Sequence, residues 1–82
     1  MNTGDLYATP ENQERLVLGQ TEDGNIAFAT RGGNTQHDYD RCQIQRPEVF
    51  TAEATLVNTV VTDELARVQS KFAPWLAAKN IR

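Results

Sequence analysis

The chain of 82 residues lacks several features that define common protein classes. Its single cysteine, Cys42, excludes an intramolecular disulfide, so an oxidising compartment would not stabilise the fold. Its apolar runs are far shorter than the roughly 18 residues of a membrane-spanning helix. A basic and apolar leader typical of a secretory signal is also missing. We therefore expect a cytoplasmic protein that is not embedded in a membrane.

Basic charge is scarce as well. Eight Lys and Arg residues stand against eleven Asp and Glu residues, which gives a formal net charge of −3. Nucleic-acid-binding proteins usually carry a basic stripe and have a high isoelectric point, whereas the isoelectric point here is about 4.9. The composition therefore does not favour a nucleic-acid partner and indicates a mixed, solvated surface.

Reactive side chains are few and poorly grouped. The only histidine, His37, and Cys42 would point to opposite faces of a strand, which argues against both a metal site and a nucleophilic pair. Asp38 and Asp40 would share a face, as any such pair on a strand does. The glycine-rich residues 31–35 lack the spacing of a phosphate-binding loop. A short chain also has little room for a catalytic pocket, so we expect no enzyme, no metal and no cofactor.

Turn signals divide residues 1–50 into short strands. The pair Asp23-Gly24 between two apolar runs is typical of a tight β-hairpin, because both central residues must accept positive φ. Residues 31–35 mark another turn. Pro47 ends the last strand because proline has no N–H to donate. The predicted strands form an antiparallel meander and span residues 4–7, 13–21, 25–30 and 38–45.

The remaining residues change to a helical period. Large apolar residues recur at spacings of three and four. Residues 55–62 are rich in β-branched side chains, which lose χ1 freedom in a helix. We favour one continuous helix and keep as the alternative a fifth strand there, with the helix starting at Thr62. Pro74 predicts a kink, or a separate last turn. The apolar stripe consists of Phe50, Ala54, Val57, Val61, Leu65, Val68, Phe72, Trp75 and Leu76.

These patterns predict one α+β domain over residues 1–82, with a β-meander in residues 1–50 and a helical segment in residues 51–82. A small curved antiparallel sheet of four or five strands would pack against the C-terminal α-helix. A bent meander of this size has the architecture of an SH3-like half-barrel. That comparison concerns shape alone and rests on no sequence motif.

The predicted helix is longer than the sheet beneath it. A helix of about 20 residues is about 30 Å long, whereas short strands span about 17–25 Å. We therefore expect its C-terminal part, with Val68, Phe72, Trp75 and Leu76, to form an interface, because aromatic and leucine side chains beside basic ones are typical of one. The hypothesis is a non-enzymatic interaction module that binds a protein partner or forms a homodimer through this helix. In the alternative, Trp75 folds back onto its own sheet.

A second hypothesis is nucleic-acid binding through the sheet. Arg31, Tyr39 and Arg41 would carry the contacts, since alternation places Tyr39 and Arg41 on one face of the strand over residues 38–45. Arginines neutralise phosphates, and aromatic rings stack on bases. Acidic residues lie among them, however, so charge pairing across strands explains the same pattern.

Overall fold

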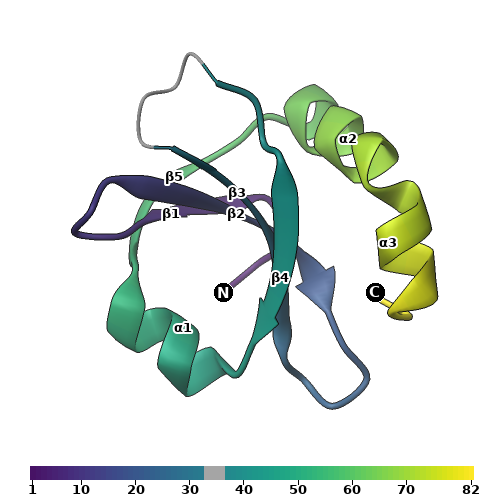
Figure 1. Cartoon of the computed structure of the whole chain (residues 1–82), viewed down its shortest axis with the longest axis horizontal. Coiled ribbons are helices and arrows are strands. Elements are labelled where there is room, and N and C mark those ends of the chain that lie inside the picture. Colours follow the sequence, from purple (N-terminus) through teal and green to yellow (C-terminus); the bar gives the residue numbers. More distant parts are fainter. Residues whose placement is uncertain (33–36) are drawn as a thin grey trace.

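The structure, a computed structural model, describes residues 1–32 and 37–82 (Figure 1). Part of the predicted turn at residues 31–35 therefore lies outside the described residues. The elements in chain order are β1 (Asp5–Ala8), β2 (Gln13–Gln20), β3 (Ile26–Gly32), β4 (Arg41–Gln45), α1 (Pro47–Glu53), β5 (Thr55–Thr59), α2 (Thr62–Lys71) and α3 (Ala73–Ala78).

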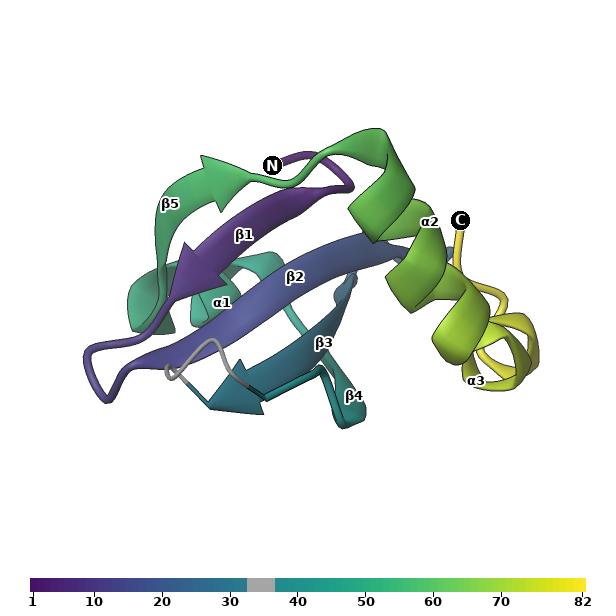
Figure 2. The ribbon, with the colours of Figure 1, turned by 90° about the horizontal axis from the view of Figure 1, so that it is seen from above.

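The strands form one antiparallel sheet in the order β4-β3-β2-β1-β5. Within the described residues β4 and β5 do not pair, so the sheet is open and these strands lie at its opposite edges (Figure 2). The predicted β2–β3 hairpin turns at Gly24, whose φ of 87° favours glycine. The predicted α+β class with a small antiparallel sheet is confirmed, and the likeness to an SH3-like half-barrel stays a comparison of shape.

One face of the sheet is covered by α1. Phe50 of this helix is fully buried, and its ring centroid lies 4.9 Å from those of both Tyr7 and Phe28 in edge-on contacts. Val17 and Ile26 belong to the same buried cluster. Aromatic pairs in this geometry add to the stability gained by burial alone. The helix that connects β4 to β5 is therefore anchored to the middle of the sheet.

The opposite face is covered by α2. Val68 of α2 is fully buried against Leu6, Leu16 and Leu18, and Tyr39 lies in the same cluster. Because side chains alternate along a strand, neighbouring residues of β1 and β2 supply the two different clusters. In Figure 1, α1 and the α2–α3 pair accordingly lie on different sides of the twisted strands. Both faces of the sheet are thus covered by helices.

The favoured prediction of one continuous helix is wrong, and the alternative with a fifth strand holds. The first helix begins at Pro47, whose missing N–H is tolerated in a first turn. It ends at Glu53, and Ala54 is extended, with φ −139° and ψ 151°. The chain runs on as β5 to Thr59, and α2 begins at Thr62. The β-branched side chains between these helices favour a strand over a helix.

The fourth strand is shorter than the predicted strand over residues 38–45, because β4 begins at Arg41. Asp38, which precedes it, is bound by two basic side chains of α2. Tyr39 consequently lies in the buried cluster under α2, whereas Arg41 is exposed. The prediction that Tyr39 and Arg41 share one face of the strand is therefore wrong, because Tyr39 precedes β4 and packs under α2.

The last part of the chain forms two short helical pieces. Helix α2 ends at Lys71, and α3 begins at Ala73 with Pro74 in its first turn, as expected from the position of the proline. The chain then returns to the sheet, where Arg82 and Gln20 exchange two backbone hydrogen bonds of 2.9 Å. The end of the chain is thus fastened to β2 and does not project freely from the sheet.

Candidate protein interface

The exposed apolar side chains are concentrated at one edge of the sheet. Among the described residues, the large apolar side chains that are exposed are those of Met1, Leu56, Val57 and Val61, at 41%, 52%, 54% and 71%. The last three belong to β5 and to the residues that connect it to α2. We call residues 55–61 the β5 edge. In water, covering a patch of this kind with another surface lowers the free energy of the system.

A β-bulge lies at the two exposed apolar residues of β5. Tyr7 of β1 lies opposite Leu56 and Leu6 lies opposite Asn58, so Val57 has no opposite residue. A bulge interrupts the alternation of side chains between the two faces and bends the strand. Both Leu56 and Val57 are about half exposed, and the other three residues of β5 are exposed as well.

The backbone of β5 is hydrogen-bonded on one side. Val60 donates its N–H to the carbonyl oxygen of Gly4 over 2.9 Å, toward β1. Neighbouring N–H groups in a strand point in opposite directions, and the N–H of Thr59 is bound by the side-chain oxygen of Asn58 over 2.8 Å. Because β1 is the only neighbour of β5 among the described strands, the outer side of β5 offers unpaired backbone groups.

Charge is missing along the β5 edge. No Asp, Glu, Lys or Arg occurs in the sequence between Glu53 and Asp63. Glu53 itself is bound by Arg15 over 3.0 Å, and hydrogen bonds from Gln45 and Arg15 hold its pKa below the usual range. Edge strands are commonly protected from other chains by charged residues, and within β5 such residues are absent.

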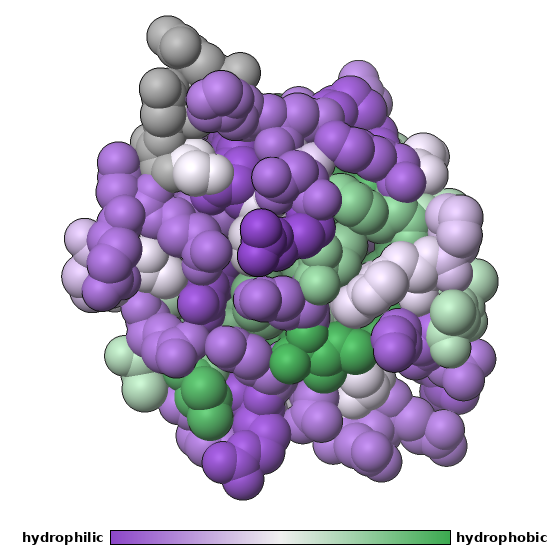
Figure 3. All heavy atoms as spheres, viewed as in Figure 1, coloured by the Kyte–Doolittle hydropathy of each residue, from purple (hydrophilic) through white to green (hydrophobic). Residues whose placement is uncertain are grey.

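The predicted interface on the C-terminal helices is largely used within the molecule. Val68 is fully buried, whereas Phe72, Trp75 and Leu76 are half-buried. Phe72 and Leu76 pack against the buried cluster under α2. The single long helix that was expected to extend beyond the sheet is replaced by α2 and α3, and the chain returns to β2 after α3. Figure 3 still shows an apolar band on the side where β4, α2 and α3 lie, within a mainly hydrophilic surface.

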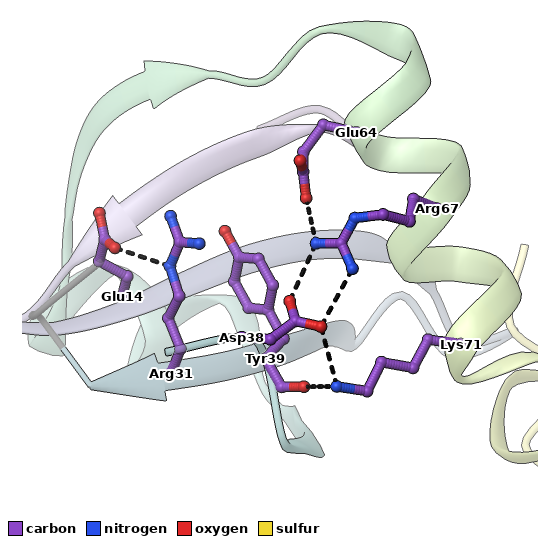
Figure 4. A network of polar contacts seen from close by, with 7 residues as sticks. All are labelled: Glu14, Arg31, Asp38, Tyr39, Glu64, Arg67 and Lys71. Carbon is purple, nitrogen blue, oxygen red and sulfur yellow. Dashed lines mark hydrogen bonds and ion pairs between the residues drawn. The ribbon is translucent and has the colours of Figure 1, made fainter. Parts of the chain in front are cut away.

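The residues named for nucleic-acid binding are mostly engaged with each other. The guanidinium of Arg31 lies 4.4 Å from the ring centre of Tyr39 and is bound by Glu14 over 2.8 Å (Figure 4). Tyr39 is fully buried, so its ring is not presented to a base, and its hydroxyl has no hydrogen-bond partner in the described part of the chain. Arg41 is exposed. The structure thus packs the partly exposed Arg31 against the buried ring of Tyr39.

A polar network joins the segment before β4 to α2. Asp38 accepts hydrogen bonds of 3.0 and 2.9 Å from Arg67 and one of 3.0 Å from Lys71, and Arg67 also binds Glu64 (Figure 4). Hydrogen bonds from Arg67 and, with a smaller effect, from Lys71 hold the pKa of Asp38 well below its usual range. These side chains are partly exposed, so the network positions the chain and offers no enclosed reaction site.

Among the described residues, Cys42 is weakly reactive and the potential metal ligands are not grouped. Burial raises the pKa of the Cys42 thiol to about 11, which leaves little of the reactive thiolate at neutral pH. The described residues contain no group of three or more potential metal ligands. A hollow of about 300 Å³ lies beside Arg31 and Arg41, but Asp40 and Glu11 also line it, so it has no clear preference for an anion.

Comparison with known proteins adds no further information on this edge. No protein-family model, curated protein or solved structure matches the chain. In the part of the chain that the structure describes, no helix has the length and apolar character needed to cross a bilayer.

Sequence reasoning missed the β5 edge as a surface. The signal was the uncharged and β-branched stretch over residues 55–62, which identified the alternative strand. An uncharged strand is typical both of the centre of a sheet and of an edge that meets another chain. The strand order decides between the two, and local sequence does not reveal it.

Proposed function

We propose that this protein is a small non-enzymatic interaction module that associates with itself through the β5 edge. One observation carries the proposal. Apart from Met1, the exposed large apolar side chains of the described residues all lie at one edge of the sheet, and they are those of Leu56, Val57 and Val61. Their burial in a complex would be favourable in proportion to the apolar area removed from water.

The small size of the chain supports the same proposal. A chain of 82 residues buries a smaller share of its surface than a larger domain does, so a partner subunit adds burial that the monomer lacks. The two clusters on the faces of the sheet already use most of the large apolar side chains. The β5 edge is where most of the exposed large apolar side chains of the described residues lie.

The test is the absolute mass of the protein in solution. Light scattering on a gel-filtration column, run across a hundredfold dilution from about 1 mM, should give a mass that falls toward the 9.2 kDa of one chain as the protein is diluted. A mass of 9.2 kDa at every concentration would contradict self-association. The concentration range is wide because a small interface gives a weak complex.

The C-terminal helices provide a second surface for the same function. Phe72, Trp75 and Leu76 are half-buried, and Trp75 is the largest of them. If this surface is the interface, Trp75→Ala should weaken association by about 2 kcal/mol. If the β5 edge is the interface, Trp75→Ala should leave the mass profile unchanged. This one variant therefore shows which of the two surfaces forms the interface.

A further inference from the structure

We propose that the partner at the β5 edge is the β5 strand of a second copy, paired antiparallel about a twofold axis beside Val57, so that one sheet continues through both molecules. This inference rests on the proposed function and adds the geometry of the contact. The axis would pass through the middle of β5 (Thr55–Thr59).

The occupant must be an extended strand. On either side of the bulge at Val57, the outer side of β5 exposes unpaired N–H and C=O groups, and another strand satisfies such groups with a continuing ladder. Figure 2 shows β5 at the outer rim of the sheet, with β1 on its inner side. On pairing, the side chain of Asn58 would release the N–H of Thr59, which it binds in the free molecule.

The sequence of β5 suits a copy of itself. With the axis beside Val57, Thr55 lies opposite Thr59 of the second copy, and Val57 lies opposite its own counterpart. Threonine pairs and pairs of β-branched residues stabilise facing strands, and like charges would destabilise them. Since no charged residue occurs between Glu53 and Asp63, the twofold pairing places no like charges opposite each other along the strand.

The other edge explains why the pairing closes at two copies. A head-to-tail contact would place β4 against β5, and β4 carries Arg41, whose charge would lose water against an apolar strand. A twofold contact uses the β5 edge of both copies and leaves β4 at the two outer ends. Isologous contacts of this kind close as dimers, whereas head-to-tail contacts of this kind continue into filaments.

The size of the contact sets the expected affinity. A standard interface buries about 800 Å² per partner, about a sixth of the 4896 Å² of accessible surface of this chain. Five strand residues span only about 17 Å, and Val61 adds one exposed side chain beside them. We therefore expect an interface below standard size and a Kd on the order of 10 μM or weaker.

Disulfide crosslinking at the axis tests the geometry. In the Cys42→Ala background, Val57→Cys should form a covalent dimer on mild oxidation, because directly opposed residues in antiparallel strands lie about 4.5–5.5 Å apart at Cα, within disulfide range. The matched control is Gln43→Cys in the same background, an exposed position in the middle of β4. We expect crosslinking at least about tenfold faster for Val57→Cys.

Amide hydrogen exchange of the unmodified protein supplies a second measurement that does not depend on any variant. Raising the concentration from about 1 μM to 1 mM, across the expected Kd, should slow exchange in residues 55–59 and leave residues 41–45 unchanged. A dimeric mass without preferential crosslinking at Val57→Cys, or without protection of residues 55–59, would overturn the strand pairing while the interaction function stands. A monomer at every concentration would overturn both.

Discussion

The two edges of the sheet, β4 and β5, have the same strand length and different side chains. Arg41 and Gln43 of β4 are exposed and polar, and Gln45 is tied to Arg15 and Glu53 by hydrogen bonds of 3.2 and 3.1 Å. Along β5 the exposed side chains are apolar or threonine and asparagine, and none is charged. The comparison teaches that two edges of equal length can differ in how readily another strand joins them because of the side chains that they carry.

The largest expected effect concerns the helix that connects the two edges. Phe50→Ala removes the buried ring that holds α1 against Tyr7 and Phe28, and we expect it to lower the free energy of unfolding by about 3–5 kcal/mol. Urea unfolding followed by circular dichroism measures the loss. Glu48→Ala, at an exposed position on the same helix, is the control and should change stability by less than about 0.5 kcal/mol. Equal effects of the two changes would contradict the role of Phe50 as the anchor of α1.

The sharpest comparison of the edges places one charge on each. Val57→Lys should raise the Kd of the dimer at least about tenfold, equivalent to about 1.4 kcal/mol, because two ammonium groups would meet near the axis. Gln43→Lys, its counterpart on β4, should leave the Kd within about twofold, since it lies outside the contact. Light scattering across the dilution series measures both. Weaker association of Gln43→Lys than of Val57→Lys would show that β4 forms the contact.

The reactivity of a thiol on each edge compares how far β4 and β5 are buried. Burial raises the pKa of Cys42 to about 11, so the thiolate fraction at pH 8 should be about 100-fold below that of an ordinary cysteine. Val57→Cys in the Cys42→Ala background is exposed and should react with a chromogenic disulfide reagent at an ordinary rate. The measurement is the rate for folded protein diluted below the Kd, with unfolded protein in urea as reference. Similar rates for the two folded proteins would contradict the burial of Cys42.

The smallest expected effect lies in the network beside β4. Because Arg67 and Lys71 lower the pKa of Asp38, the ionised form stabilises the fold above the ordinary pKa of aspartate, and this contribution is lost as the pH falls below about 4. Asp38→Asn should therefore reduce stability at pH 7 by no more than about 1 kcal/mol, since the pair is partly exposed. The difference between the two proteins should shrink at pH 3. An equal difference at both pH values, in urea unfolding, would exclude the ion pairs as its cause.

The strands of the first half could be predicted because their signals are local. Asp23-Gly24 fixes a hairpin, and the alternation of large and small side chains after it separates the two faces of β3. The helix prediction over residues 55–61 failed because Val57 and Val61 match the helical period, although their β-branched side chains favour a strand. The spacing of apolar residues does not include that preference.

The site could be predicted less well than the fold because it depends on contacts between distant residues. Tyr39 lies in the buried cluster under α2 and Asp38 beside it binds basic residues of α2, and the strand pattern contains neither contact. Val68 was correctly placed on an apolar stripe, but the sheet covers it. The β5 edge is exposed because β5 joins β1 at the end of the sheet, and that strand order is a property of the whole chain.

The pairing of β5 with β1 also has a kinetic consequence. It joins Asp5–Ala8 to Thr55–Thr59, which lie far apart in the sequence, so the long loop between them must close before this ladder can form. Contacts between such distant segments form slowly, because the entropy of closing the loop must be overcome first. Until then β1 is itself an open edge, and the β5 strand of a neighbouring chain can occupy it. Refolding of this protein should therefore give its best yield at high dilution.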